Sequence, residues 1–232
     1  MLVVRPRIRL AALAVLLLAA AWLPAARAAL KVIVISDLNG SYGSTSYEPG
    51  VGLAVSRILE LEPDLVISTG DMVAGQRLHP PLAAPAIEAM WTAFHTTVST
   101  PLAEAGIPLA VTPGNHDASA YASFQSERQI FQEQWQSRVP GLEFVDREGY
   151  PFNYAFALGG VLFVSLDVTR VGALDESQRR WLDGLLRTHG KGYRHRVVFS
   201  HLPIYPFTEG RESEVSADHE LERILQRHGV EL

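Results

Sequence analysis

Four short apolar runs constrain the fold of this chain more than any other feature. They are continuous, rich in β-branched residues, and lie at 30–35 (LKVIVI), 65–68 (LVIS), 107–112 (IPLAVT) and 196–200 (RVVFS). Such runs are typical of strands that are buried on both faces of a sheet. Segments with helical spacing lie between them, at 51–61, 83–97, 123–137 and 175–186. The alternation predicts an α/β fold.

A hairpin adds an antiparallel component to this prediction. Residues 152–156 and 161–166 alternate in the manner of strands, and they flank Gly159-Gly160, which favours a tight turn. The sequence shows no internal repeat and no interdomain linker. A chain of 232 residues, 47% hydrophobic and 19% charged, can bury a substantial core. We therefore expect one domain over residues 29–232.

The first 28 residues have the pattern of a signal peptide. Three arginines, at positions 5, 7 and 9, precede an apolar run over 10–23, and Ala26-Arg27-Ala28 forms an A-x-A cleavage pattern. The run is shorter than the roughly 18 to 20 residues that span a bilayer. We expect cleavage after Ala28, export to the periplasm or the exterior, and no stable membrane anchor afterwards. An uncleaved anchor is the alternative.

Charge and cysteine content exclude several classes of function. Four of the 20 basic residues and none of the 25 acidic ones lie in residues 1–28, so the remainder carries 16 basic and 25 acidic residues, a formal charge of −9. Such a surface does not predict nucleic-acid binding. The absence of cysteine excludes disulfides, a zinc–thiolate site, a cysteine nucleophile and lipoprotein attachment.

Each of the four apolar runs ends in residues able to bind a metal ion. These residues are Asp37, Asp71, Asn115 with His116, and His201. A single Asp after a strand is usually a turn former or a helix cap. However, ligands of α/β sheets bind beyond the carboxyl ends of the strands, so four such endings together predict one metal site.

Two carboxylates, an amide and imidazoles suit a pair of divalent cations. A carboxylate between two cations offsets their repulsion, and oxygen and imidazole ligands complete the site. The cations lower the pKa of a bridging water and neutralise phosphate oxygens during in-line attack. Substrates with poor leaving groups also need a general acid.

In these residues the chain resembles the calcineurin-like metallophosphoesterases. That family carries D-x-H, G-D, G-N-H-D/E, a lone His after a strand, and G-H-x-H. This chain has, in the same order, Asp37-Leu38-Asn39, Gly70-Asp71, Gly114-Asn115-His116-Asp117 and Ser200-His201. The resemblance covers residues 30–232. It implies a four-layer α/β/β/α sandwich of mixed sheets, here incomplete at the C-terminus.

The resemblance also implies a role for each matching residue. Asp71 is expected to bridge both metals, Asp37 to bind the first, and Asn115 and His201 to bind the second. His116 is expected to protonate the leaving group or steady the transition state without binding metal. The implied cofactors are two divalent ions, with Mn, Fe, Zn and Mg all open. The implied substrate is a phosphomonoester or phosphodiester, and the oligomeric state is not indicated.

Three residues near these motifs have roles that the resemblance does not settle. Asn39 stands where the family has His. Its carbonyl oxygen is a harder and weaker ligand, which favours Mn²⁺ or Mg²⁺; alternatively, Asn39 only caps the loop. Asp117 is expected to be a helix cap or turn residue. Tyr42, in the loop after Asp37, either contacts a substrate or packs.

The second departure from the family is the absence of any G-H-x-H motif. We interpret the sequence as ending before that motif, and we expect this chain to bind metal poorly and to show weak phosphatase activity. A non-catalytic exported binding protein with a degenerate metal site is the main alternative. A serine hydrolase built on Ser36 or Ser200 is disfavoured because the chain has no G-x-S-x-G elbow.

Overall fold

The computed structural model describes residues 29–230. The predicted signal peptide at 1–28 and the last two residues lie outside the described residues, so the predicted cleavage after Ala28 is not tested. Between residues 29 and 230, no helix has the length and apolar character needed to cross a lipid bilayer.

The first sheet contains three parallel strands in the order β1-β2-β3, which are β1 Val32–Ile35, β2 Leu65–Ser68 and β3 Leu109–Val111. All four residues of the central strand β2 are buried, as its apolar run predicts. The helical segments that link these strands are α2 Pro49–Leu61, α3 Ala84–Phe94, the π-helical turn η1 His95–Ser99 and α4 Thr100–Glu104. Because the strands are parallel, their carboxyl ends share one edge of the sheet.

The second sheet is mixed. Its strands pair in the order β4 Glu143–Gly149, β5 Asn153–Leu158, β6 Val161–Ser165 and β7 His195–Phe199, antiparallel except for β6 with β7. The predicted hairpin is confirmed, because β5 and β6 are joined by Gly159 and Gly160, both with positive φ. Glycine adopts that conformation without steric penalty. Strand β4 was not predicted, because its charged sequence EFVDREG lacks an apolar pattern.

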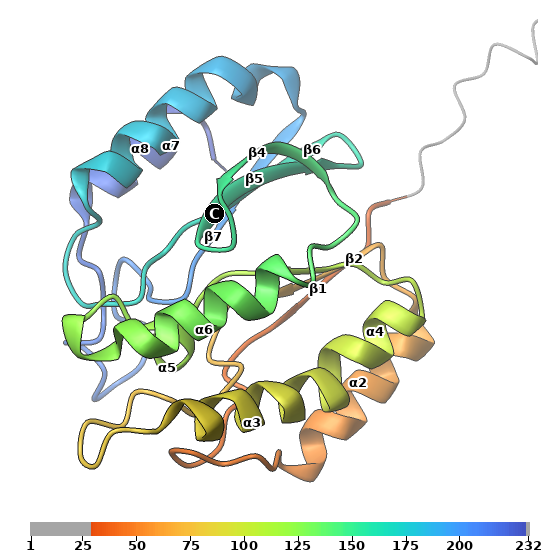
Figure 1. Ribbon diagram of the computed structural model, residues 1–232. Helices are drawn as coiled ribbons and strands as arrows, with labels where there is room; N and C mark the ends of the chain where they lie inside the picture. The colour runs from red at the N-terminus through yellow and green to blue at the C-terminus, as the bar shows by residue number, and fades with distance from the viewer. Residues whose placement is uncertain (1–28, 231–232) are drawn as a thin grey trace, which may run out of the picture. The chain divides into compact units, whose positions relative to one another are not determined.

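The two sheets face each other between two layers of helices (Figure 1). Tyr154 of β5 donates its hydroxyl proton to the carbonyl of Val111 in β3 at 2.6 Å, and Thr112 donates to the carbonyl of Leu166 at 2.8 Å. On the second sheet, an apolar cluster joins its outer face to α7 Glu176–His189 and α8 His219–Arg227. The predicted four-layer α/β/β/α sandwich is confirmed.

The remaining short elements complete this arrangement. They are α5 Asn115–Ala118, η2 Ala122–Phe124, α6 Gln125–Gln136 and η3 Gly190–Gly192. Helix α6 packs against α3 through ring contacts of Trp91 with Phe131 and Trp135.

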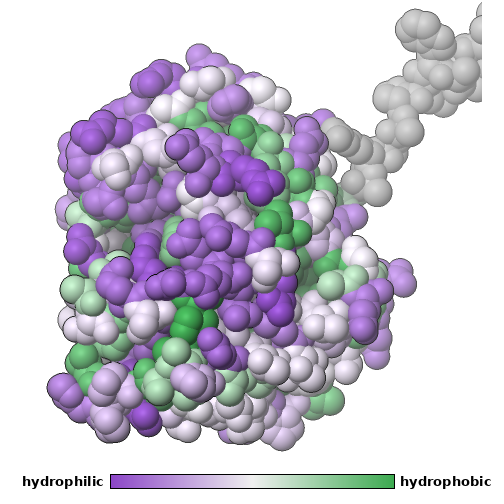
Figure 2. All heavy atoms as spheres, viewed as in Figure 1, coloured by the Kyte–Doolittle hydropathy of each residue, from purple (hydrophilic) through white to green (hydrophobic). Residues whose placement is uncertain are grey.

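On the face shown in Figure 2, hydrophilic side chains predominate and apolar ones are scattered, as is normal for a folded surface.

His95 lies where the predicted helix over 83–97 changes to the π-helical turn. It is buried among aromatic rings, and its ring nitrogens lie 2.7 Å from the Ser99 hydroxyl and 3.1 Å from the Gln134 side-chain oxygen. Burial, aided by the charge of Arg138, lowers the pKa of His95 to about 4. The native state therefore holds this imidazole neutral near neutral pH.

This depressed pKa predicts an acid-sensitive contribution to stability. The unfolded chain takes up a proton at His95 as pH falls through about 6.5, whereas the native state does so only near 4, so stability falls across that window. We expect the wild type to lose about 2 kcal/mol more than His95→Gln between pH 7 and pH 4.5. Urea unfolding at both pH values measures this difference. The exposed His189→Gln should behave like the wild type, and an equal loss in all three proteins would contradict the assignment.

Candidate metal centre

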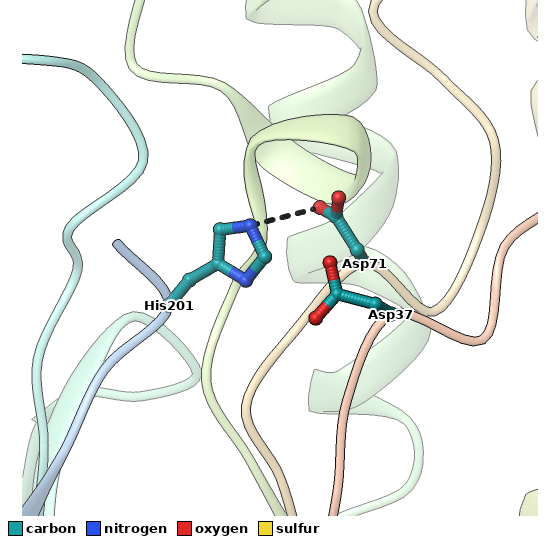
Figure 3. A group of neighbouring side chains, drawn as sticks. All are labelled: Asp37, Asp71 and His201. Atoms are coloured by element: carbon teal, nitrogen blue, oxygen red, sulfur yellow. Dashed lines mark ion pairs between the residues drawn. The ribbon is translucent and has the colours of Figure 1, made fainter. Parts of the chain in front are cut away.

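The loops that follow β1, β2 and β7 bring three side chains together that are far apart in sequence. Asp37, Asp71 and His201 each offer one ligand atom, and these atoms all lie within 4.8 Å of one another. Figure 3 shows the two carboxylates and the imidazole turned toward a common centre. The convergence follows from the topology, because each residue lies just beyond the carboxyl end of its strand.

A cavity of about 480 Å³ contains the whole predicted site. Its lining includes every residue that the sequence predicted as a ligand or acid: Asp37, Asn39, Asp71, Asn115, His116 and His201. The fourth strand ending, after β3, thus joins the other three at the same place.

The side chains of His201 and Asn115 are oriented by neighbours outside the predicted set. The Nδ1 atom of His201 lies 2.9 Å from the Thr69 carbonyl oxygen. Because a carbonyl oxygen can only accept a hydrogen bond, Nδ1 carries the hydrogen. The Asn115 amide nitrogen donates to the Gln76 side-chain oxygen at 2.7 Å, which directs the Asn115 oxygen toward His201. Both contacts are typical of groups that orient metal ligands.

As a result, three acceptor atoms meet at one point. The Nε2 atom of His201 lies 2.9 Å from the Asn115 side-chain oxygen and 3.4 Å from an Asp71 carboxylate oxygen. With the hydrogen on Nδ1, a neutral His201 has only a lone pair at Nε2, and the two oxygens also present lone pairs. Lone pairs that face one another repel, and a cation at their centre would remove this repulsion. The donor set therefore fits a divalent ion.

Asp71 has the environment of a carboxylate that a cation would stabilise. Asp71 is buried, and this burial raises the pKa of its carboxyl group. The charge of Asp37 also raises this pKa, whereas His201 and His116 lower it. The backbone N–H of His116 donates to it at 2.9 Å. Both Asp37 and Asp71 have positive φ, 54° and 53°. Left-handed backbone at non-glycine residues is typical of functional sites, where the surrounding structure holds it in place.

Asn39 is held against the loop that follows β2. Its backbone N–H donates to the Asp71 carbonyl at 3.1 Å, and its amide nitrogen donates to the Val73 carbonyl at 3.3 Å. Because the nitrogen is engaged, the side-chain oxygen is the atom that can bind a cation. The contacts fit both roles considered for Asn39, as a loop cap and as a ligand.

His116 lies beside the cluster. Its Nδ1 atom lies 3.0 Å from the Gly75 carbonyl, and its Nε2 atom lies 3.9 Å from a carboxylate oxygen of Asp71. The ring of Tyr42 packs on it, with 5.3 Å between ring centroids, while about half of Tyr42 stays exposed. Of the two options for Tyr42, packing is thus observed, and its exposed part remains free to meet a substrate.

Asp117 has a larger role than the sequence indicated. It caps α5 by accepting from the Gly114 N–H at 2.9 Å, as predicted for a helix cap. The same buried carboxylate also accepts from the backbone N–H groups of Met72 and Val73, at 2.8 and 2.9 Å. Burial and the charge of Asp71 raise the pKa of Asp117, whereas the three N–H groups lower it. Asp117 therefore ties together the loops that carry Asp71 and Asn115.

A four-layer sandwich with carboxylates and imidazoles at the strand ends is the architecture of a metal-dependent phosphoesterase. The match of a family model confirms this class. The chain belongs to the calcineurin-like phosphoesterase family, whose model matches residues 30–232. Metal-dependent hydrolysis of phosphoesters is the general chemistry of that family, and its members use divalent ions.

Solved structures of two phosphatases share the fold. One is a dimetal phosphatase from Danio rerio, with a TM-score of 0.57 at 16% identity, over 86% of this chain and 78% of that one. The other is a purple acid phosphatase from yellow lupin, with a TM-score of 0.60 at 20% identity, over 87% of this chain and 36% of that one. A search of curated proteins found no match. At these identities the two structures support the fold alone.

Proposed function

We propose that this chain hydrolyses phosphomonoesters or phosphodiesters with two divalent cations. In this proposal Asp71 binds both cations, Asp37 and Asn39 bind the first, and Asn115 and His201 bind the second. The observation that supports it most strongly is the meeting of three acceptor atoms from Asp71, Asn115 and His201. Cations held by these residues would supply an activated water as the nucleophile and would neutralise phosphate oxygens.

The chain's own groups provide orientation and proton transfer. Thr69 and Gln76 fix the ligand atoms of His201 and Asn115, so little rearrangement is needed on binding. The Gly75 carbonyl holds the ring of His116, and a proton on its Nε2 atom can pass to the leaving-group oxygen. Asp37, which is exposed, gives the open side of the cavity a negative charge that attracts cations.

The donor set limits the expected rate and metal preference. The five proposed ligand residues are fewer than two cations of four to six ligands each would take, so we expect weak metal binding and slow turnover. Among Mn, Fe, Zn and Mg, the oxygen-rich side of the site favours Mn²⁺ or Mg²⁺.

We also propose that residues 1–28 direct export to the periplasm or the exterior, which N-terminal sequencing of the exported protein would test.

A non-catalytic binding function is the second candidate. It is favoured by Asn39, which stands in place of the family's His. On that account the chain binds Mn²⁺ or a phosphorylated ligand but does not hydrolyse it.

Turnover of two aryl phosphates separates these candidates. p-Nitrophenyl phosphate has a good leaving group and phenyl phosphate a poor one. We expect slow, Mn²⁺-dependent hydrolysis that a chelator abolishes. His116→Asn should lower phenyl phosphate hydrolysis by about 100-fold or more, the usual range for general-acid catalysis, and lower p-nitrophenyl phosphate hydrolysis less. Mn²⁺ binding without any turnover would favour the binding protein.

A further inference from the structure

One wall of the metal cavity comes from residues 202–217, which follow the proposed ligand His201 between β7 and α8 and include no other proposed ligand and not the acid His116. Eight residues of this segment line the cavity: Leu202, Pro203, Pro206, Phe207, Thr208, Arg211, Glu214 and Val215. The base of the segment is fixed, because the N–H groups of Ser216 and Ala217 donate to the carbonyls of Pro203 and Ile204 at 2.8 and 3.1 Å. These bonds close a loop, and the residues between them line the cavity.

Phe207 is the most exposed large apolar side chain among the described residues, at 84%. Single exposed apolar residues are common and usually need no explanation. Phe207 differs because it lines the same cavity as Asp37, Asp71 and His201. The Phe207 ring buries little apolar area in the free protein. It can bury its face against a planar group of a bound molecule.

Arg211 brings a positive charge to the same wall. Its guanidinium is paired with Glu214, and its side chain is 65% exposed. An exposed pair of this kind is worth little, so Arg211 can exchange Glu214 for a stronger partner. It also lies close enough to Asp37 for their charges to interact, so it lies near the metal cluster. Arginine pairs with phosphate through two parallel hydrogen bonds.

We propose that Phe207 and Arg211 select phosphoesters that carry a planar apolar group next to the phosphate. Phe207 packs against the planar group, and Arg211 pairs with a phosphate oxygen. The inference rests on the proposed function in placing the phosphate at the metal cluster, and it adds the class of substrate.

Binding of two non-hydrolysable phosphonates tests the role of Phe207 without relying on turnover. Calorimetry with Mn²⁺ present compares phenylphosphonate with methylphosphonate. We expect the wild type to bind the phenyl compound about tenfold more tightly, and Phe207→Ala to lose this preference. Leu53→Ala is the control, because Leu53 is 72% exposed on α2 and does not line the cavity, and it should keep the preference. No preference in the wild type, or an unchanged one in Phe207→Ala, would overturn the proposal.

A matched pair of arginines tests the role of Arg211. Arg223 on α8 is paired with Glu220 and is 66% exposed, but it does not line the cavity. We expect Arg211→Ala to weaken binding of both phosphonates about tenfold, Arg211→Lys to weaken it less, and Arg223→Ala to leave it unchanged. Equal affinities in the Arg211 and Arg223 variants would overturn this part.

The two proposals can fail separately. If phosphonate binding depends on Phe207 but the protein hydrolyses no phosphoester, the result would support substrate selection by Phe207 and contradict the catalytic function. The ratio of kcat/KM for phenyl phosphate to that for glycerol phosphate gives the opposite test. If this ratio is the same in the wild type and in Phe207→Ala, the result would contradict substrate selection by Phe207 but not the catalytic function.

Discussion

Asp71→Asn is expected to lower the Mn²⁺ affinity of this chain by at least about 100-fold and to reduce phosphoester turnover to the uncatalysed rate. Asn has nearly the same size as Asp but no charge, and Asp71 is the residue proposed to contact both cations. Isothermal calorimetry with Mn²⁺ and the phenyl phosphate assay measure the two effects. Glu60→Gln, which removes a carboxylate from the exposed pair with Arg57, should leave both unchanged.

The stability of the same variant distinguishes lost binding from lost folding. Burial raises the pKa of Asp71, so its charge is unfavourable in the metal-free protein and the neutral amide should unfold at the same or a higher temperature. A variant that loses Mn²⁺ binding while its melting temperature is maintained supports Asp71 as a ligand. Wild-type Mn²⁺ affinity in Asp71→Asn would show that the cation binds elsewhere.

Gly114→Ala is expected to have the second largest effect. A Cβ atom at Gly114 would overlap the backbone nitrogen and the carboxylate oxygen of Asp71. The φ of Gly114 is −93°, a value open to any residue, so crowding alone requires glycine. The loop cannot move aside cheaply, because Asp117 accepts from the backbone N–H of Met72 and the N–H of His116 donates to Asp71. We expect Mn²⁺ binding to be lost and the free energy of unfolding to fall by about 1–3 kcal/mol.

Gly52→Ala is the matched control for this substitution. Gly52 lies within α2, and a Cβ atom there would meet nothing within 4 Å. Alanine is favoured over glycine in a helix by up to about 1 kcal/mol, so this variant should be slightly more stable and bind Mn²⁺ normally. Urea unfolding and calorimetry compare the two variants. If Gly114→Ala behaved like Gly52→Ala, the close approach between these loops would be wrong.

The apolar runs predicted an α/β fold with polar residues gathered at its strand ends for a simple physical reason, whereas the four layers and the position of Asn39 were implied by the family resemblance. Buried parallel strands have continuous apolar runs, and their carboxyl ends lie at one edge, so polar residues at those ends meet. Asp37, Asp71 and His201 could therefore be placed together from local patterns, although 130 positions separate Asp71 from His201. The order of the motifs gave the same answer independently.

The groups that orient these residues could not be predicted in this way. Thr69 acts through its carbonyl, which any residue possesses, and Gln76 is an unremarkable residue in a loop. The contacts of Asp117 with Met72 and Val73 join residues more than 40 positions apart. The same is true of the wall that carries Phe207, whose distance from the metal cluster depends on how the loop after β7 folds back. Local spacing carries no signal for such contacts.

Anomalous X-ray scattering from crystals soaked in Mn²⁺ tests the central claim most directly. The account predicts a manganese peak bonded to a carboxylate oxygen of Asp71 and to Nε2 of His201, with Asp37 or Asn115 completing its contacts. Strong peaks only at other acidic surface sites, with Asp71 and His201 still in mutual contact, would contradict the assignment of this cavity as a metal centre.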